Sequence, residues 1–351
     1  MPADRPRYGL DAAATVFDYP PGVRRVCREL IDGLSSHPAV EALPLVPAAD
    51  DDPRAWRNRE LPRLERELNL TGLVSFTSAF PLRGRGVRIQ LIHELPWRHG
   101  ASENAGWRHK LWARHGWRRA SAIVVPSGRV LADLEDESKR AARKTQVIPW
   151  GISAAFGPKP NTNDDAVLDE LGLGGKPFFL MAGASRPKKR VDLAVTALLS
   201  LHDSGARLVV TGALHASISK ELMLARNLGL EGRLVYTGEL DEPVLATLTR
   251  RAAGALSLAD SEGFGLGTLE ALASGTPVVV RPGSAPSEIA GPHAIEADDP
   301  ESIGAALRAL IAAPDTAPKP TALVAHSKRY SWERATGEFA ELLIAAAASR
   351  D

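Results

Sequence analysis

The stretch "DSEGFGLGTLEALASGTPVVV", residues 260–280, places three glycines between two glutamates, Glu262 and Glu270, and ends in a run of valines. "GALSLA", residues 254–259, precedes it and is expected to be a buried strand, and a helix is expected to begin near Gly267. Glycines let the backbone turn freely and leave its N–H groups uncovered by side chains. These N–H groups and the helix N-terminus favour an anion. The stretch therefore predicts a ligand that carries both hydroxyl and phosphate groups.

Each of the two glutamates also has a simpler interpretation. Glu270 falls in the first turn of the expected helix, where a carboxylate complements the helix dipole. Glu262 lies in the expected loop, where a charged side chain is commonly solvated. For either glutamate alone the simpler interpretation is favoured. Two glutamates on the two sides of a glycine loop favour the binding of ligand hydroxyls.

Short apolar runs alternate with longer amphipathic stretches through almost the whole chain. Residues 22–34, for example, place apolar side chains on one helical stripe. Continuously apolar strands separated by helices predict parallel sheets that are covered on both faces. The expected strands are residues 8–12, 41–46, 73–76, 87–93, 122–126 and 145–149, then 177–184, 206–212, 233–238, 254–259 and 276–280.

The length of 351 residues favours two domains of roughly 150 to 200 residues each. "GPKPNTNDD", residues 157–165, lacks apolar residues and predicts a linker between two doubly wound α/β domains. The expected domains are residues 1–158 and 159–330, and a capped helix at 331–351 is expected to cross back to the first domain. Ligands of such sheets bind at the carboxyl ends of the strands, so the cleft between two facing domains is the expected site.

Composition limits the classes of function. The formal net charge of +1 provides no overall field that would recruit nucleic acid. Cys27 is the only cysteine, which excludes an internal disulfide and a cysteine-rich metal site. The histidines show no metal-ligand spacing, so no metal and no cofactor is expected. No apolar run approaches the ~20 residues of a membrane span, and we expect a cytoplasmic protein.

"ASRPKKRVDL", residues 184–193, follows an expected strand and concentrates positive charge at the start of a helix. One interpretation is a solvated basic turn. Cations are mildly unfavourable at a helix N-terminus, however, so the cluster also indicates a bound polyanion. Diphosphate is the simplest such ligand, because arginine binds it with two hydrogen bonds and lysine as a point charge. The cluster consists of Arg186, Lys188, Lys189 and Arg190.

Two segments of the first half carry further signals. "IQLIHELPW", residues 89–97, places His93 at the carboxyl end of a strand, as a structural histidine or as a contact for a sugar hydroxyl or a leaving group. "GWRHKLWARHGWRR", residues 106–119, interleaves three tryptophans with basic residues. It suggests base stacking, docking of the helix on anionic lipid, or, as the favoured interpretation, a helix that buries Trp107 and Leu111 while its arginines are solvated.

Residues 262–280 resemble the donor-binding motif of the retaining, nucleotide-sugar-dependent glycosyltransferases of the GT-B fold, in family four (group 1). In that family a glutamate, a Gly-Phe-Gly-Leu loop and a second glutamate precede a Gly-Thr-Pro-Val-Val strand. The resemblance extends over nearly the whole chain. Its further motifs are "RYGLDAAAT…PPGVRRVCREL", "IHELPW", "VVPSGRVLADL", "VIPWGISAAFGP", "RLVYTGELDEPVLATLTRRA", "GSAPSEIAG" and "RYSWERATGEFAELL".

The resemblance implies roles for particular residues. Glu270 would bind the ribose hydroxyls, and Glu262 the hydroxyls of the donor sugar. Lys189, with Arg186 beside it, would bind the diphosphate, and His93 would lie near the reacting carbon. The remaining donor contacts would come from the loop Gly263, Phe264, Gly265 and Leu266, and from Gly22 of the first domain.

The sequence departs from the family pattern at several positions, which affect the first-domain contacts, and so the acceptor and the catalytic geometry, more than the fold. Ala184 follows Gly183 where the family has arginine, and Arg186 is expected to reach the same place. The other departures are Gly267 for proline, Trp150 for asparagine, Glu94 for aspartate and Arg24 for a second glycine.

The resemblance implies metal-independent transfer of a hexose, with retained configuration, from GDP-mannose or UDP-glucose to a glycan or a lipid-linked acceptor. This predicts a mannosyltransferase type of activity in cell-surface polysaccharide biosynthesis, with a peripheral contact to the inner face of the cytoplasmic membrane through residues 106–119. The alternatives are a sugar-nucleotide epimerase, and a degenerate partner protein that binds nucleotide or a membrane surface. Nucleic acid is the least favoured ligand because the net charge is so small.

Overall fold

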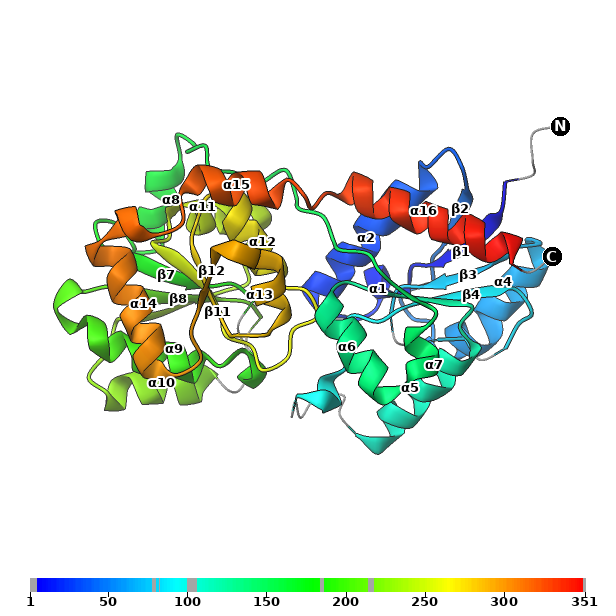
Figure 1. Cartoon of the computed structure of the whole chain (residues 1–351), viewed down its shortest axis with the longest axis horizontal. Helices are drawn as coiled ribbons and strands as arrows, with labels where there is room; N and C mark the ends of the chain where they lie inside the picture. Colours follow the sequence, from blue (N-terminus) through cyan, green and yellow to red (C-terminus); the bar gives the residue numbers. More distant parts are fainter. Residues whose placement is uncertain are drawn as a thin grey trace. The chain divides into compact units, whose positions relative to one another are not determined.

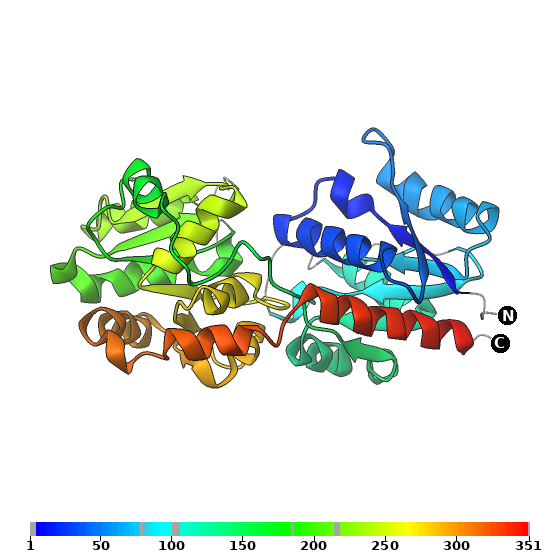
Figure 2. The ribbon, with the colours of Figure 1, turned by 90° about the horizontal axis from the view of Figure 1, so that it is seen from above.

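The chain forms two compact units, residues 1–151 together with 330–351, and residues 152–329 (Figure 1). This computed structural model describes residues 5–77, 80–81, 83–99, 106–183, 186–213 and 218–349, and of Arg108 and His109 only the backbone. Both units have parallel sheets with helices on both faces (Figure 2), and the predicted doubly wound α/β class is confirmed.

The boundary between the units lies at 151/152 rather than at 158/159. The segment expected to be a linker belongs to the second unit, because both of its ends are packed there. Phe156 is buried against Ala246 and Ala273. Asp164 begins a helix and its carboxylate accepts hydrogen bonds from Arg250 and Thr247.

Among the described residues of the first unit, six parallel strands form one sheet in the order β2-β1-β3-β4-β5-β6. All six coincide with strands expected from the sequence. Their bounds are β1 Arg7–Asp11, β2 Glu41–Leu45, β3 Gly72–Ser75, β4 Val87–Leu91, β5 Ala122–Val125 and β6 Thr145–Val147. The helices are α1 Ala13–Val16, α2 Pro21–Ser35, α3 Pro53–Ala55, α4 Leu61–Glu67, α5 Trp107–Arg119, α6 Gly128–Glu137, α7 Lys139–Ala142 and α16 Trp332–Ala348, with a π-helical turn η1 Trp56–Glu60 and a 3₁₀ turn η2 Pro96–Arg98.

The C-terminal helix α16 lies alongside α2 in the first unit (Figures 1 and 2). Ser331 caps it through a hydrogen bond from the Arg334 amide, as the sequence predicted. Trp150, which replaces the family's asparagine, is fully buried and stacks on Trp332 with ring centroids 6.5 Å apart. The tryptophan at this position therefore packs against the first turn of α16.

Among the described residues of the second unit, six parallel strands follow the order β12-β11-β10-β7-β8-β9. Their bounds are β7 Phe178–Met181, β8 Arg207–Thr211, β9 Leu234–Gly238, β10 Gly254–Ser257, β11 Val278–Val280 and β12 Ala294–Glu296. The edge strand β12 was not expected, because its three residues form no apolar run. The helices are α8 Asp164–Glu170, α9 Val191–Ala197, α10 Ile218–Asn227, α11 Glu242–Arg251, α12 Leu266–Ala273, α13 Ala285–Ala290, α14 Pro300–Ala312 and α15 Pro320–Ser327, with 3₁₀ turns η3 Pro187–Lys189, η4 Leu198–Ser204, η5 Gly291–His293 and η6 Pro314–Thr316.

Alternate residues of β7 enter different cores of the second unit. Phe179 and Met181 are buried in one cluster, which also contains residues of α9 and α14. Phe178 and Leu180 are buried in another, which contains residues of α8 and α11. Because successive side chains of a strand point to opposite faces, both faces of the sheet are covered, and this explains the continuous apolar run in the sequence.

The buried pair of Asp164 and Arg250 gives a test of the boundary. Both side chains are 3% exposed. We expect Asp164→Ala to lower the free energy of unfolding of the second unit by about 3–5 kcal/mol, because the guanidinium is left buried without its partner. The neighbouring Asp165 pairs with Arg251 at the surface, so Asp165→Ala should cost at most about 1 kcal/mol. Denaturant unfolding measures the stability of both variants. Equal losses of stability would contradict the packing of Asp164 in the second unit.

The same pair predicts a pH dependence. The Arg250 hydrogen bonds hold the pKa of the Asp164 carboxyl below its usual value. Its contribution to stability is therefore complete above the pKa of the unfolded chain and is lost as the pH falls through the lower pKa of the folded chain. Asp164→Asn should flatten the loss of stability below about pH 4, the usual range of an aspartate. An unchanged acid profile would contradict this.

Candidate functional site

Two loops of the second unit meet because they follow neighbouring strands. β7 pairs with β10, and the chain continues from β7 to β8 on one side and from β10 to β11 on the other. This is the switch point at which doubly wound sheets bind ligands, beyond the carboxyl ends of the strands. The loop after β7 carries the basic cluster, and the loop after β10 carries Glu262 and the glycines. The Asp260 amide joins the two by donating to the Lys188 carbonyl at 2.8 Å.

The basic cluster forms a tight turn. Residues 187–189 make the 3₁₀ turn η3, and Arg190 has the left-handed conformation, with φ of 56°. Its guanidinium is held by Asp192 at 3.0 Å and by Asp260 at 3.3 Å. Arg190 is thus engaged within the protein. Of the residues expected here, Ala184 lies outside the described residues, and Arg186 precedes the turn and is half-buried.

Lys189 and Glu262 form an ion pair across the two loops. Burial raises the pKa of the Glu262 carboxyl, but Lys189 and Lys188 lower it by more, so the net pKa lies below its usual value. Glu262 is therefore ionised at neutral pH. The structure joins two residues 73 positions apart, each of which was predicted to contact the donor.

The glycine loop leads directly into α12. Gly265 has φ of 97°, which a residue with a side chain rarely adopts, and it occupies the N-cap position without a side-chain hydrogen bond to the helix. Phe264 is buried and anchors the loop. Gly263 is buried as well, and Leu266 is the first residue of the helix. The binding of an anion at the start of α12 stays a prediction.

Glu270 lies one turn deeper than expected. α12 begins at Leu266, so Glu270 is in the second helical turn and is buried. The prediction of a first-turn carboxylate was wrong because Gly267, expected near the helix start, is already inside the helix. The dipole interpretation of Glu270 consequently loses its basis.

Sequence reasoning missed two residues that support the loops. Asp260 accepts hydrogen bonds from Arg190 and from Arg281. Arg281 directly follows β11, the neighbour of β10, so its guanidinium starts at the same edge of the sheet. The sequence did contain a signal for Arg281, because a charged residue that directly follows a buried strand lies at the carboxyl edge of the sheet, where ligands bind.

Two of the predicted site residues belong to the first unit. Nε2 of His93 lies 2.9 Å from the carbonyl oxygen of Phe76. Since a carbonyl only accepts, Nε2 carries the proton and Nδ1 is left as an acceptor. Burial lowers the pKa of His93, so the ring is neutral at pH 7. Gly22 is exposed in the first turn of α2. His93 is therefore a hydrogen-bonded structural residue through Nε2, while Nδ1 is left as a hydrogen-bond acceptor.

Helix α5 covers most of the segment 106–119, and its burial differs from the favoured interpretation. Trp107 is 71% exposed and Leu111 is 62% exposed, whereas Trp117 is buried against Trp97. The prediction that Trp107 and Leu111 are buried was therefore wrong. A helix buries one face, and here that face is the one that carries Trp117 and Ala113.

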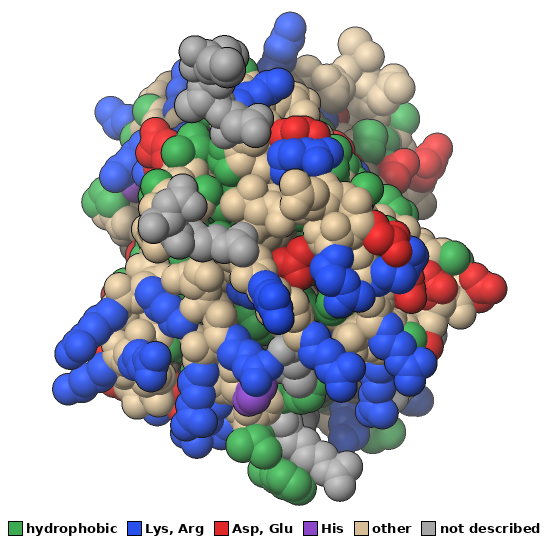
Figure 3. All heavy atoms as spheres, turned by 90° about the vertical axis from the view of Figure 1, so that its right-hand side faces the viewer, with side chains coloured by type: hydrophobic (Ala, Val, Ile, Leu, Met, Phe, Trp, Pro, Cys, Tyr) green, Lys and Arg blue, Asp and Glu red, His purple; other side chains and the backbone are tan. Residues whose placement is uncertain are grey.

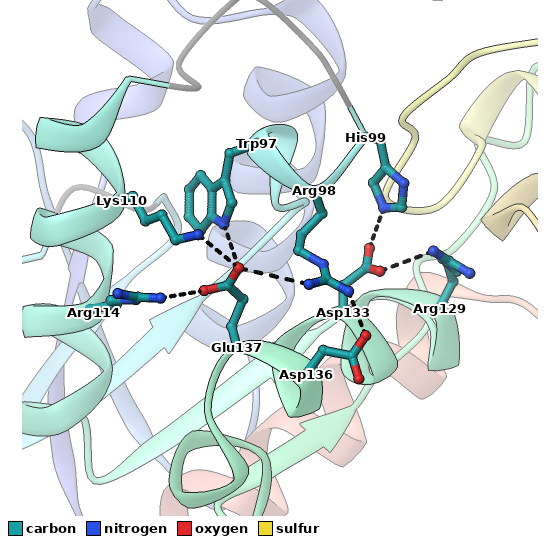
Figure 4. Close-up of polar contacts among 9 residues, drawn as sticks. All are labelled: Trp97, Arg98, His99, Lys110, Arg114, Arg129, Asp133, Asp136 and Glu137. Atoms are coloured by element: carbon teal, nitrogen blue, oxygen red, sulfur yellow. Dashed lines mark hydrogen bonds and ion pairs between the residues drawn. The ribbon is translucent and has the colours of Figure 1, made fainter.

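A polar network explains which way α5 faces (Figure 4). The side chain of Glu137, on α6, accepts hydrogen bonds from Trp97 at 3.2 Å and Arg114 at 2.8 Å, and Lys110 lies 3.1 Å away. Burial raises the pKa of Glu137, but these donors lower it by more. Two residues of α5 are thus bound to α6, and the adjacent face with Trp107 and Leu111 is turned to solvent.

The exposed face of α5 is also basic. Figure 3 shows Lys and Arg side chains over the lower part of this side of the first unit, where α5 and α7 lie in Figure 1. Trp107, Leu111, Arg114 and Arg118 recur at helical spacing on one face. The exposed basic residues here are Arg114, Arg118, Arg119, Lys139, Arg140 and Arg143. In the described part of the chain, no helix combines the length and apolar character needed to cross a membrane.

Solved structures share the architecture of the whole chain. Sucrose-phosphate synthase from Thermosynechococcus elongatus has a TM-score of 0.77 at 17% identity and covers 98% of this chain and 100% of its own. HepE from Anabaena in complex with UDP-glucose has a TM-score of 0.76 at 16% identity, covering 97% and 99%. The chain has the GT-B fold of glycosyltransferases.

The match to a family model lies within the second unit. Residues 165–328 match the family model "Glycosyl transferases group 1". A GDP-mannose-dependent alpha-(1-6)-phosphatidylinositol dimannoside mannosyltransferase of Mycobacterium tuberculosis is 34% identical over 223 residues, which are 61% of this chain and 56% of the relative. The alignment thus spans about half the length of the curated relative. Residues 165–328 thus match the group 1 glycosyl transferases, and the resemblance drawn from residues 262–280 is confirmed.

Gly265, at the N-cap of α12, and Gly267, in its first turn, should respond differently to substitution by alanine. A Cβ at Gly265 would lie 3.0 Å from Pro286 Cγ at a positive φ, so Gly265→Ala should cost about 1–3 kcal/mol and displace the loop. A Cβ at Gly267 would have Ala182 at 3.7 Å as its nearest contact, and Gly267→Ala should stabilise α12 by up to about 1 kcal/mol. Thermal unfolding measures both. A Gly265→Ala protein as stable as the wild type would contradict the loop geometry.

Proposed function

We propose that the chain is a retaining glycosyltransferase that moves a hexose from a nucleoside-diphosphate sugar to a hydroxyl of a glycan or lipid-linked acceptor. The observation that carries the proposal is the ion pair of Lys189 and Glu262 at the switch point of the second unit, where the glycine loop leads into α12. A cation and loop N–H groups suit a diphosphate, and a neighbouring carboxylate suits sugar hydroxyls.

We propose the following contacts to the donor. Lys189 and Arg186 neutralise the diphosphate, with the backbone of Gly263, Phe264, Gly265 and Leu266 as further donors. Glu262 accepts hydrogen bonds from the donor sugar, and Glu270 from the ribose.

Departure of the diphosphate builds negative charge on its terminal phosphate. Lys189, Arg186 and the start of α12 are fixed donors that stabilise this charge without reorganising. We propose that they make a metal ion unnecessary, that the acceptor attacks from the face the diphosphate leaves, and that the leaving phosphate takes the acceptor proton. Neutral His93 offers Nδ1 as an acceptor for a hydroxyl near the reacting carbon.

The donor sugar is proposed to be mannose or glucose. The M. tuberculosis relative is named as GDP-mannose-dependent, which favours GDP-mannose. The HepE structure contains UDP-glucose, but at its low identity it supports only the fold. A mannosyl transfer in cell-surface polysaccharide or lipid-linked sugar synthesis, at the cytoplasmic face of the membrane, is the corresponding cellular role.

Donor class is tested by thermal unfolding with UDP, GDP, ADP and dTDP in EDTA. A nucleotide at about 100 times its Kd should stabilise the protein by about 2.7 kcal/mol, a shift of a few degrees. One responding nucleotide would name the base and support metal-free binding. No shift with any of them would favour the degenerate partner protein, and conversion of the donor without acceptor would favour an epimerase.

Lys189→Ala should reduce kcat by about 10²–10³-fold, the range found when one donor to a developing oxyanion is removed. The control is Lys176→Ala, because Lys176 is exposed before β7, at the opposite edge of the sheet. Turnover is measured with the nucleotide sugar identified above, and the anomeric configuration of the product by NMR. A folded Lys189→Ala protein with normal turnover would refute the role, and an inverted product would refute retention.

We propose, further, that the exposed face of α5 docks on anionic lipid. Trp107 and Leu111 would enter the headgroup region, and Arg118 on the same face would pair with anionic lipid. Trp107→Ala should weaken binding to phosphatidylglycerol vesicles by about tenfold or more, because burying a large apolar side chain contributes about 1.5–3 kcal/mol. Met223→Ala is the control, at a residue 64% exposed in the second unit. Equal effects of the two substitutions in a sedimentation assay would contradict this proposal.

A further inference from the structure

Arg57 is a half-buried arginine in the π-helical turn η1 of the first unit. Its Nε is enclosed and has no hydrogen-bond partner among the described residues. Its guanidinium lies over the ring of Trp112, 5.3 Å from the centroid. An enclosed N–H without an acceptor destabilises a folded protein by about 1–3 kcal/mol. Fold stability alone therefore does not account for an arginine here.

The surroundings of Arg57 belong to the switch point of the first sheet. β1 lies between β2 and β3, and the chain passes from β2 across β1 to β3. Asp11 ends β1, and Thr77 follows β3. The hydroxyl of Tyr19, in the segment between α1 and α2, is hydrogen-bonded to Thr77. Side chains from different segments thus converge where doubly wound sheets bind ligands.

The nearby carboxylate of Asp11 is engaged by other groups. Its Oδ1 accepts a hydrogen bond from the Trp56 indole at 2.9 Å and from the Ala13 amide at 3.1 Å. Arg57 and Tyr19 interact with Asp11 electrostatically. Asp11 therefore holds Trp56, the residue next to Arg57, in place, and it acts on the Arg57 guanidinium through its charge.

We propose that Arg57, supported by Trp112 and with Tyr19 beside it, binds a phosphate group carried by the acceptor. The inference rests on the proposed function, because only a transferase has an acceptor. Arginine suits a phosphate through its planar pair of N–H groups, and stacking on an aromatic ring fixes that plane. The phosphate is a lipid phosphodiester headgroup or a soluble phosphate ester. It is a second anion site, built from residues other than Lys189 and Arg186.

The test compares Arg57→Met, Arg57→Lys and the control Arg59→Gln. Arg59 is exposed and lies two residues further along the same turn, so that Arg59→Gln removes the same charge as Arg57→Met. Calorimetric titration with glycerol 3-phosphate, and with glycerol as the uncharged match, is made at a saturating concentration of the nucleotide that stabilises the protein. The diphosphate site of the second unit is then occupied and does not take up the probe.

We expect wild type and Arg59→Gln to bind glycerol 3-phosphate and not glycerol, and Arg57→Met to bind it at least tenfold more weakly. Arg57→Lys should bind glycerol 3-phosphate with intermediate affinity, since lysine keeps the positive charge but lacks the planar pair of N–H groups. The melting temperature of Arg57→Met should not fall, because the enclosed N–H is removed while an aliphatic stem still covers Trp112. A lower melting temperature with unchanged phosphate binding would overturn the proposal, because it would make Arg57 purely structural.

Vesicles separate the two sources of phosphate. If Arg57→Met loses the extra binding that phosphatidylinositol adds to phosphatidylcholine vesicles, the ligand is a lipid headgroup. If it loses only glycerol 3-phosphate binding, the ligand is a soluble ester. If it loses neither, the proposal is overturned.

Failure of the proposed function has a different signature, which is the absence of any nucleotide response. In that case the titration is repeated in the Lys189→Ala chain, where the second-unit anion site is impaired. Binding that still depends on Arg57 would retain the phosphate site without a transferase. A nucleotide response without Arg57-dependent binding would retain the transferase and overturn the phosphate site.

Discussion

The pairing of β7 with β10 is the constraint on which the site of the second unit depends. The paired residues Leu180 and Ala255 are 75 positions apart in the sequence, because β8 and β9 lie between the two strands in the chain but are added to the sheet on the other side of β7. Their loops must then leave the sheet at the same point. The hydrogen bond from the Asp260 amide to the Lys188 carbonyl, and the pair of Lys189 with Glu262, are consequences of this pairing.

The ion pair sets the electrostatic state in which the site meets a ligand. Lys189 holds Glu262 ionised despite burial, and Glu262 in turn fixes the ammonium group beside the start of α12. A diphosphate that binds Lys189 and a sugar that binds Glu262 would replace contacts within the protein by contacts to the donor. Preorganisation of this kind avoids the reordering of flexible charged side chains when the ligand arrives.

The first unit uses the same topology with different chemistry. Its switch point carries Asp11, Tyr19, Thr77 and the arginine over Trp112, rather than a glycine loop and a lysine. The tryptophan that departs from the family pattern, Trp150, packs against α16 and so serves the structure of the unit. The departures therefore do not all lie in ligand contacts.

The sequence by itself determined the class of fold, the positions of eleven strands, the glycine loop and the charged residues that follow the central strands, because these are local patterns of hydrophobicity and backbone freedom. It did not determine which face of α5 is buried, since Trp107 and Trp117 have the same chemistry and only the Glu137 network on α6 selects between them. Nor did it reveal the Asp260–Arg281 pair or the position of Arg57 over the ring of Trp112. Those depend on strand order and on contacts between distant segments, which only the tertiary structure decided.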